Sequence, residues 1–337
     1  MEPDILDRPA RPESFKLLAQ QGVITPDELE QALRITGVIP DGARWANFLN
    51  KLFLFLGAML LAAGVIFFFA YNWAAMHRLL KLGVVQIALL AAVMTASYLG
   101  FERLTGKAAL LVASILTGAF LALYGQIYQT GADAYELFVG WSALIAGWVI
   151  IGNFAPLWFL QLILVQAGIY LYWGQVLESE WFIYRSPVLY EILFGINVVA
   201  LAVWELFSSR GVGWLRGRWI PRTIVDIALF LIVVPLVILI VDGHAFSGHT
   251  VSAGVLPVLY LVFAGIVVWI YQTVLFDLFM VASALLSAIV VISVFFGHAI
   301  GSNYGGFLLL SMIIVALSGG AGVWLRNLAR SQTKGAR

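Results

Sequence analysis

TIVDIALFLIVVPLVILIVD, the stretch Thr223–Asp242, decides the fold. Asp226 is its only charged residue before the terminal Asp242. A helix of about 20 apolar residues is as long as the hydrocarbon core of a bilayer is thick. Such a helix also satisfies its own backbone hydrogen bonds, which lipid cannot do. The stretch therefore predicts a transmembrane helix.

Nine further runs of this kind occur, so the sequence predicts an all-α transmembrane helical bundle of about ten spans. The predicted spans are residues 52–73, 79–100, 107–124, 136–152, 155–173, 187–207, 223–242, 251–271, 278–297 and 303–325. The fourth and fifth are joined by almost no loop, so a re-entrant hairpin is the alternative there. Whether the two halves of the chain are repeats is left open.

The composition agrees with this reading and excludes several classes of function. Hydrophobic residues make up 62% of the 337 residues and charged residues 11%. Soluble proteins average about half apolar and about a quarter charged. The net charge of +1 gives no basic field for nucleic acid. The lack of cysteine removes disulfides, thiolate metal sites and cysteine nucleophiles. We expect the lipid bilayer as partner and no nucleic acid.

Orientation follows from the placement of basic residues, which concentrate on the cytoplasmic side of membrane proteins. With the N-terminus inside, all but three of the 19 lysines and arginines fall on the cytoplasmic side; the exceptions are Arg78, Lys81 and Arg185. Both termini are therefore expected in the cytoplasm. We predict a cytoplasmic helical lead-in over residues 1–50, a transmembrane domain over 51–326 and a cytoplasmic tail over 327–337.

The lead-in carries a helix start signal. Thr25 is predicted as the N-cap, Pro26 as the first helical residue, and Glu28 as the acid that closes a capping box. A solvated segment packed on the membrane face is the favoured interpretation, and a partner-binding module is the alternative.

Two segments resemble a known family. They are Gly64–Trp73 (GVIFFFAYNW) and Tyr124–Asp133 (YGQIYQTGAD), preceded by Gly22–Pro26 (GVITP). Together they resemble the bacterial predicted-membrane-protein family known as domain of unknown function 2157, over roughly residues 15–150. The resemblance implies a protein of the bacterial inner membrane, and it implies no activity.

Signatures of soluble enzymes are absent from the sequence. It contains no Walker-type phosphate loop, no H-E-x-x-H, no G-x-S-x-G and no dinucleotide fingerprint. We therefore expect no catalytic residue, no enzymatic activity and no cofactor, with a divalent metal ion as the only alternative.

The histidines motivate that alternative. In the predicted topology all four, His77, His244, His249 and His298, lie on the outer side. Neutral imidazoles that meet there would bind Zn²⁺ or another divalent ion, and they would equally sense a drop in external pH. The simpler interpretation is that they are ordinary residues of the interface.

Polar side chains near or within the spans are the candidate ligand-facing groups. The first group, Tyr124, Gln126, Tyr128, Gln129 and Asp133, leaves the third span in a run predicted to be irregular, with Gly125 and Gly131 at turns. The second group, Gln161, Gln166 and Asn197, lies near the membrane centre, where interhelical hydrogen bonding is the favoured alternative. Asp226 is predicted to pair with Arg222, one helical turn before it.

Three hypotheses for function follow from these features. The first is a transporter-like or small-ligand-binding protein with its site at the outer face. The second is a non-enzymatic accessory or structural subunit that acts through a membrane-protein partner or as a homo-oligomer. The third is a membrane-embedded metalloprotein that uses the outer-face histidines.

Overall fold

The computed structural model describes residues 15, 18–36, 42–72, 76–129, 131–177, 186–243, 250–300 and 304–335. Within these ranges the chain is helical and has no strand. Ten of the described helices are long and apolar enough to cross a membrane. The prediction of an all-α, ten-span bundle is therefore confirmed.

The helices follow the predicted spans closely. They are α2 (Pro26–Ile35), α3 (Gly42–Asn72), α4 (Arg78–Leu99), α5 (Leu104–Tyr128), α6 (Ala134–Gly152), α7 (Ala155–Tyr172), α8 (Pro187–Ser209), α9 (Trp219–Val241), α10 (Thr250–Thr273), α11 (Leu278–Ile300) and α12 (Tyr304–Gly335). A π-helical turn, η2 (Trp173–Leu177), extends α7, and a 3-10 turn, η4 (Gly213–Leu215), separates α8 from α9.

Helix α2 begins as its sequence predicts. The backbone N–H of Thr25 donates to Glu28 Oε2 at 2.8 Å, and the N–H of Glu28 donates to Thr25 Oγ1 at 3.3 Å. Pro26 occupies the first turn, where its missing N–H has no partner to lose. The predicted capping box is confirmed.

The chain divides into two compact units, Met1–Phe120 and Leu121–Arg337, with the boundary inside α5. In the first unit, α3, α4 and α5 line a cavity of about 660 Å³. Between α4 and α5 the backbone turns so tightly that a Cβ on Gly106 would lie 2.2 Å from the carbonyl oxygen of Gly100. That corner therefore requires glycine at residue 106.

The second unit opens with the antiparallel pair α6 and α7, which turns at Asn153 in a left-handed conformation (φ 42°). Ala134–Gly152 and Ala155–Leu177 are each long enough to span. Their lengths favour two spans over the re-entrant hairpin.

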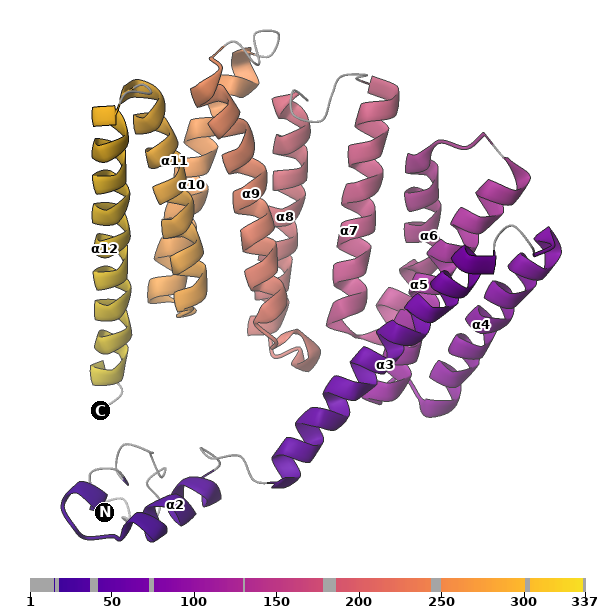
Figure 1. The fold of residues 1–337 in the computed structure, drawn as a ribbon, viewed down its shortest axis with the longest axis horizontal. Helices are drawn as coiled ribbons and strands as arrows, with labels where there is room; N and C mark the ends of the chain where they lie inside the picture. The colour runs from indigo at the N-terminus through magenta and orange to yellow at the C-terminus, as the bar shows by residue number, and fades with distance from the viewer. Residues whose placement is uncertain are drawn as a thin grey trace. The chain divides into compact units, whose positions relative to one another are not determined.

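Helices α8, α9, α10 and α11 form the buried core of the second unit, and α12 packs on α11 (Figure 1). Representative core side chains, one from each helix, are Leu193, Ile224, Leu256 and Met280. At one end of this core lie the C-terminus of α8, the N-terminus of α9 and the junction of α10 with α11. The site described next lies at that end.

Candidate ligand pocket and the ion cluster beside it

The loop between α8 and α9, residues 210–218, is shaped first by the way α8 ends. Gly211 adopts φ 90°, which favours glycine. Its N–H donates to the carbonyl of Ser208 at 3.1 Å, and the N–H of Val212 donates to that of Phe207 at 3.3 Å. This pair of bonds is a Schellman motif, in which the flanking apolar side chains, here Val212 and Phe207, accompany the turn. The motif directs the chain back toward α8.

The 3-10 turn η4 places Trp214 beside two tryptophans from different helices. Its ring centroid lies 6.1 Å from that of Trp158 on α7, in a stacked arrangement, and 5.8 Å from that of Trp204 on α8, edge to face. The indole N–H of Trp204 donates to the carbonyl of Leu215 at 3.1 Å. The loop is thus fixed to α8 by a hydrogen bond and to both helices by aromatic packing.

These tryptophans line a pocket of about 520 Å³ between α7, α8, the loop and the start of α9, which we call the tryptophan pocket. Other residues of its lining include Gln161 on α7 and Ala200 on α8. Small-molecule sites are typically apolar cavities of about 300–1,000 Å³ with a few polar groups. The tryptophan pocket has that size and that chemistry.

Gln161 supplies a polar group to the pocket. Its amide nitrogen donates to Ser142 Oγ on α6 at 2.7 Å. Its Oε1 is buried and has no hydrogen-bond partner among the described residues. A buried acceptor without a donor costs free energy, so Gln161 offers a place for a ligand hydroxyl.

An ion cluster lies at the same end of the unit and consists of Glu205, Arg218, Arg222 and Asp277. Arg218 Nη1 lies 2.9 Å from Glu205 Oε1, and Arg218 Nε lies 3.2 Å from Asp277 Oδ2. Arg222 Nε donates to the same Asp277 oxygen at 3.1 Å. The hydroxyl of Tyr271 donates to Glu205 at 2.8 Å. The cluster joins α8 and the loop to α9, α10 and α11.

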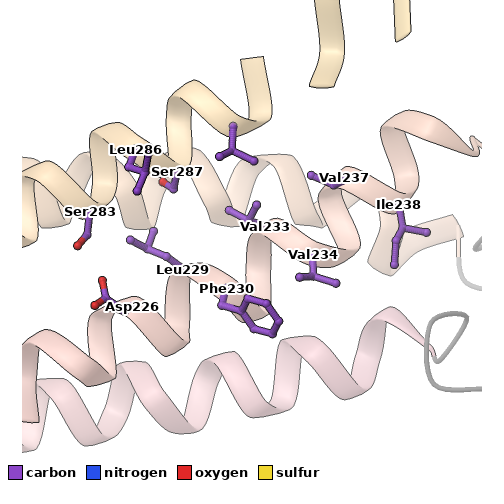
Figure 2. Close-up of a pocket in the computed structure, with 11 residues that line it drawn as sticks. Asp226, Leu229, Phe230, Val233, Val234, Val237, Ile238, Ser283, Leu286 and Ser287 are labelled. Atoms are coloured by element: carbon purple, nitrogen blue, oxygen red, sulfur yellow. The ribbon is translucent and has the colours of Figure 1, made fainter. Parts of the chain in front are cut away.

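The predicted pair of Asp226 with Arg222 is therefore wrong, because Arg222 pairs with Asp277. Asp277 is 4% exposed and forms ion pairs with both Arg218 and Arg222. The two arginines together offset the cost of burying its carboxylate. Asp226 instead lines a groove of about 520 Å³ between α9 and α11. Figure 2 shows Asp226 and Ser283 at one end of this groove, with Ser287 and mainly apolar side chains along the rest.

Asp277 is also the N-cap of α11, since its Oδ1 accepts the backbone N–H of Phe279 at 3.1 Å. Burial acts to raise the pKa of this carboxyl. The hydrogen bonds and charges of Arg222 and Arg218 outweigh burial, and the net pKa of Asp277 is lowered. The pKa of Arg218 is raised, because Glu205 and Asp277 outweigh the opposite effect of its own burial. Both groups are thus held in their charged forms.

A pH dependence follows from the lowered pKa of Asp277. Its contribution to stability is complete above the unfolded pKa of about 3.9 and is lost as the pH falls through the lower folded pKa. We expect the thermal unfolding midpoint to drop below about pH 4 in the wild type, and to drop less in Asp277→Asn. Circular dichroism in detergent at a series of pH values measures this. An equal drop in both proteins would contradict the assignment, and Asp226→Asn, the control, should keep the wild-type slope.

The central amides form interhelical hydrogen bonds. Asn197, fully buried on α8, donates its side-chain N–H to Gln166 Oε1 on α7 at 2.7 Å and to the carbonyl of Leu193 at 2.9 Å. With the bond between Gln161 and Ser142, this links α6, α7 and α8. The expected interhelical hydrogen bonds are present, and the role of these amides in ligand binding stays a prediction; of the three, only Gln161 also lines the tryptophan pocket.

The segment from Tyr124 to Asp133 is more regular than predicted. α5 continues to Tyr128, so Gly125 is helical and makes no turn. The reason is that a single glycine inside a helix costs only about 1 kcal/mol, so α5 continues past Gly125 and ends where Gln129 adopts φ 45°. Tyr124 and Tyr128, one turn apart, have ring centroids 4.7 Å apart. Gln126, Gln129 and Asp133 are exposed, and their role in ligand binding stays a prediction.

The structure describes two of the four histidines in the predicted metal site. His244 and His249 lie outside the described residues. His77 caps α4, accepting the N–H of Leu79 at 3.4 Å, and His298 is in the last turn of α11. Among the residues that the structure describes, no group of three or more histidine or acidic residues is placed to hold a metal ion. The metal site stays a prediction.

The sequence did not predict the tryptophan pocket or most of the ion cluster. The sequence counts Arg218 only among the cytoplasmic charges, and it pairs Arg222 with Asp226 in place of Asp277. It did not single out Trp214 or Asp277. The signal available was the density of tryptophan and arginine in residues 204–222, which anchoring at the membrane interface also explains.

The fold and the site define a polytopic helical integral membrane protein. Over residues 16–158, the chain matches the model of the family described as Predicted membrane protein (DUF2157). The predicted resemblance is thereby confirmed over the range that motivated it. No curated protein and no solved structure matches the chain. The family match ends at Trp158, so most of the tryptophan pocket and all of the ion cluster lie beyond it.

Proposed function

We propose that this is a non-enzymatic, small-ligand-binding protein of the bacterial inner membrane, and that its ligand occupies the tryptophan pocket. One observation carries the proposal: a loop fixed by Trp214 and Trp204 encloses a mainly apolar space of about 520 Å³ between two spanning helices. A loop that served only as a connection would need no such anchoring. The predicted outer-face mouth and a lateral partner subunit remain predictions beside this proposal.

The chemistry of the pocket sets the ligand class. Three indole rings present flat apolar surface, which suits an alkyl chain or a ring. The unpartnered Oε1 of Gln161 accepts one hydrogen bond. A ligand with an apolar body therefore satisfies the tryptophan lining, and a hydroxyl group that reaches Gln161 would add to its binding. The sequence offers no catalytic motif that would act on such a ligand.

Ala200 gives a sharp test, because it lines the pocket and Ala202, two residues further on α8, does not. The probe is phosphatidylcholine with brominated acyl chains, since bromine quenches tryptophan fluorescence on contact. We expect saturable quenching of the full chain in detergent, and binding about tenfold weaker in Ala200→Phe, because the new ring fills the pocket. Ala202→Phe should bind as the wild type does. Equal binding by all three proteins would rule the pocket out.

The proposed orientation places both termini and the loop of residues 210–218 in the cytoplasm. Because the chain has no cysteine, single cysteines report on topology directly. We expect an impermeant maleimide to label whole cells that carry cysteine at His77 or Asp133. Cysteine at Arg103 or Arg216 should stay unlabelled until the cells are opened. The opposite pattern would show that both termini lie outside the cytoplasm. A mixed pattern would show that the number of spans is wrong.

A further inference from the structure

The surroundings of the tryptophan pocket specify its ligand further, if the proposed function holds. Four arginines lie on or next to the loop: Arg210, Arg216, Arg218 and Arg222. Arg218 and Arg222 are balanced by Glu205 and Asp277 in the ion cluster. Neither Arg210 nor Arg216 pairs with a carboxylate in the part of the chain that the structure describes. The loop thus keeps two uncompensated positive charges.

Both arginines neighbour residues of the pocket lining, Arg210 in space and Arg216 in sequence. The guanidinium of Arg210 lies 6.0 Å from the ring centroid of Phe207, a lining residue. Arg216 directly follows Leu215, which also lines the pocket. The pocket therefore combines an aromatic interior with a cationic edge.

The pocket also opens sideways. Trp158, Val203 and Phe207 line it and are at the same time exposed on the surface of spanning helices. The exposed surface of a spanning helix faces hydrocarbon, so a molecule already dissolved in the bilayer reaches the pocket without crossing water.

From these observations, we propose that the tryptophan pocket binds an anionic phospholipid of the bilayer, with an acyl chain among the tryptophans and its phosphate at Arg210 and Arg216. Basic pockets between spanning helices near the membrane surface are suited to anionic head groups. Arginine presents a planar fork of donors that fits a phosphate. The groove between α9 and α11 provides an internal contrast, since the ionisable group at its end is the carboxylate of Asp226.

The test compares brominated phosphatidylglycerol with brominated phosphatidylcholine, each titrated into the full chain in detergent and followed by tryptophan quenching. We expect the anionic lipid to bind more tightly. In the double variant Arg210→Gln/Arg216→Gln, the affinity for phosphatidylglycerol should fall about fivefold for each arginine removed. The affinity for phosphatidylcholine should fall much less, because its choline cation offsets the charge of its phosphate. Arg216→Lys, which keeps the charge, should keep a preference for the anionic lipid.

Two matched controls separate charge from structure. Lys51→Gln/Arg103→Gln removes the same charge from exposed basic residues of the other unit and should preserve the preference. Ala200→Phe should weaken the binding of both lipids. A midpoint of thermal unfolding close to the wild-type value shows that the double variant is folded.

Each other outcome is decisive. Equal binding of the two lipids, blocked by Ala200→Phe, would overturn the anionic lipid while leaving the pocket in place. A preference that survives in the double variant would also overturn it. Tighter binding of a brominated fatty acid than of phosphatidylglycerol would identify a carboxylate amphiphile, and not a phospholipid, as the ligand. Quenching that is insensitive to Ala200→Phe for every lipid would reject the proposed function itself.

Discussion

Replacing Asp277 by asparagine should destabilise the unit of residues 121–337 by about 3 kcal/mol. The substitution leaves Arg218 and Arg222 facing a neutral amide at 3.2 and 3.1 Å in place of a buried carboxylate. Removing one partner of a buried ion pair typically costs about 3–5 kcal/mol. The lower value applies here because both arginines keep contact with solvent. Unfolding by sodium dodecyl sulfate in mixed micelles, followed by circular dichroism, measures the loss.

Asp226→Asn is the matched control. It removes one carboxylate for which the described residues provide no ion pair, and it should change the free energy of unfolding by no more than about 0.5 kcal/mol. Asp277→Ala, which also removes the acceptor that caps α11, should cost about 1 kcal/mol more than Asp277→Asn. Equal effects of the substitutions at 226 and 277 would show that the ion cluster does not hold the unit together.

Replacing Trp204 by alanine should cost about 3–5 kcal/mol. The indole is 8% exposed, packs edge to face on Trp214 and donates to the carbonyl of Leu215. The change leaves a cavity and releases the loop of residues 210–218. The same unfolding experiment measures the loss of stability, and the tenfold effect of Ala200→Phe on lipid binding should disappear in this background.

The control for Trp204 is Trp269, which is 60% exposed on α10. Trp269→Ala should cost less than about 1 kcal/mol, because little apolar surface is buried there. Trp204→Phe should cost about 1 kcal/mol from the lost hydrogen bond, together with a smaller packing loss. If Trp204→Ala unfolds at the wild-type surfactant concentration, the aromatic anchoring of the loop is not a source of stability.

The spans could be predicted from sequence because the bilayer imposes a length and a polarity on each of them. Their ends were predictable only where a local signal coincides with the interface. α8 begins at Pro187 as predicted, whereas α3 begins at Gly42 and α12 continues to Gly335, about ten residues beyond the predicted spans at each place. Hydropathy marks the part of a helix that lies in lipid, and backbone hydrogen bonding continues the helix into polar residues.

The ion cluster could not be predicted in the same way, because its partners are distant in sequence. Arg218 and Asp277 are 59 residues apart, and Tyr271 and Glu205 are 66 residues apart. The pattern visible in the sequence, Arg222 with Asp226 one turn later, satisfies the spacing rule for helices. Tertiary packing replaced that local pair by a buried one.

In the candidate site, too, local features could be predicted and features set by tertiary packing could not. Gln161, Gln166 and Asn197 were identifiable because polar residues in the middle of a span are costly and therefore stand out. The pocket that Gln161 lines depends on the placement of Trp214, which is set by a Schellman turn at Gly211 and by contacts with two other helices. No periodic pattern of residues in the sequence predicts a turn and two interhelical contacts that meet at one side chain.

Electron cryo-microscopy of the full chain in nanodiscs that contain phosphatidylglycerol tests the central claim most directly. The account predicts elongated density between α7 and α8 in contact with Trp214, with its head-group end at Arg210 and Arg216. In Ala200→Phe that density should be absent while the helices stay in place. A wild-type pocket that holds no density, or density that persists unchanged in the variant, would contradict the claim that this pocket is a ligand site.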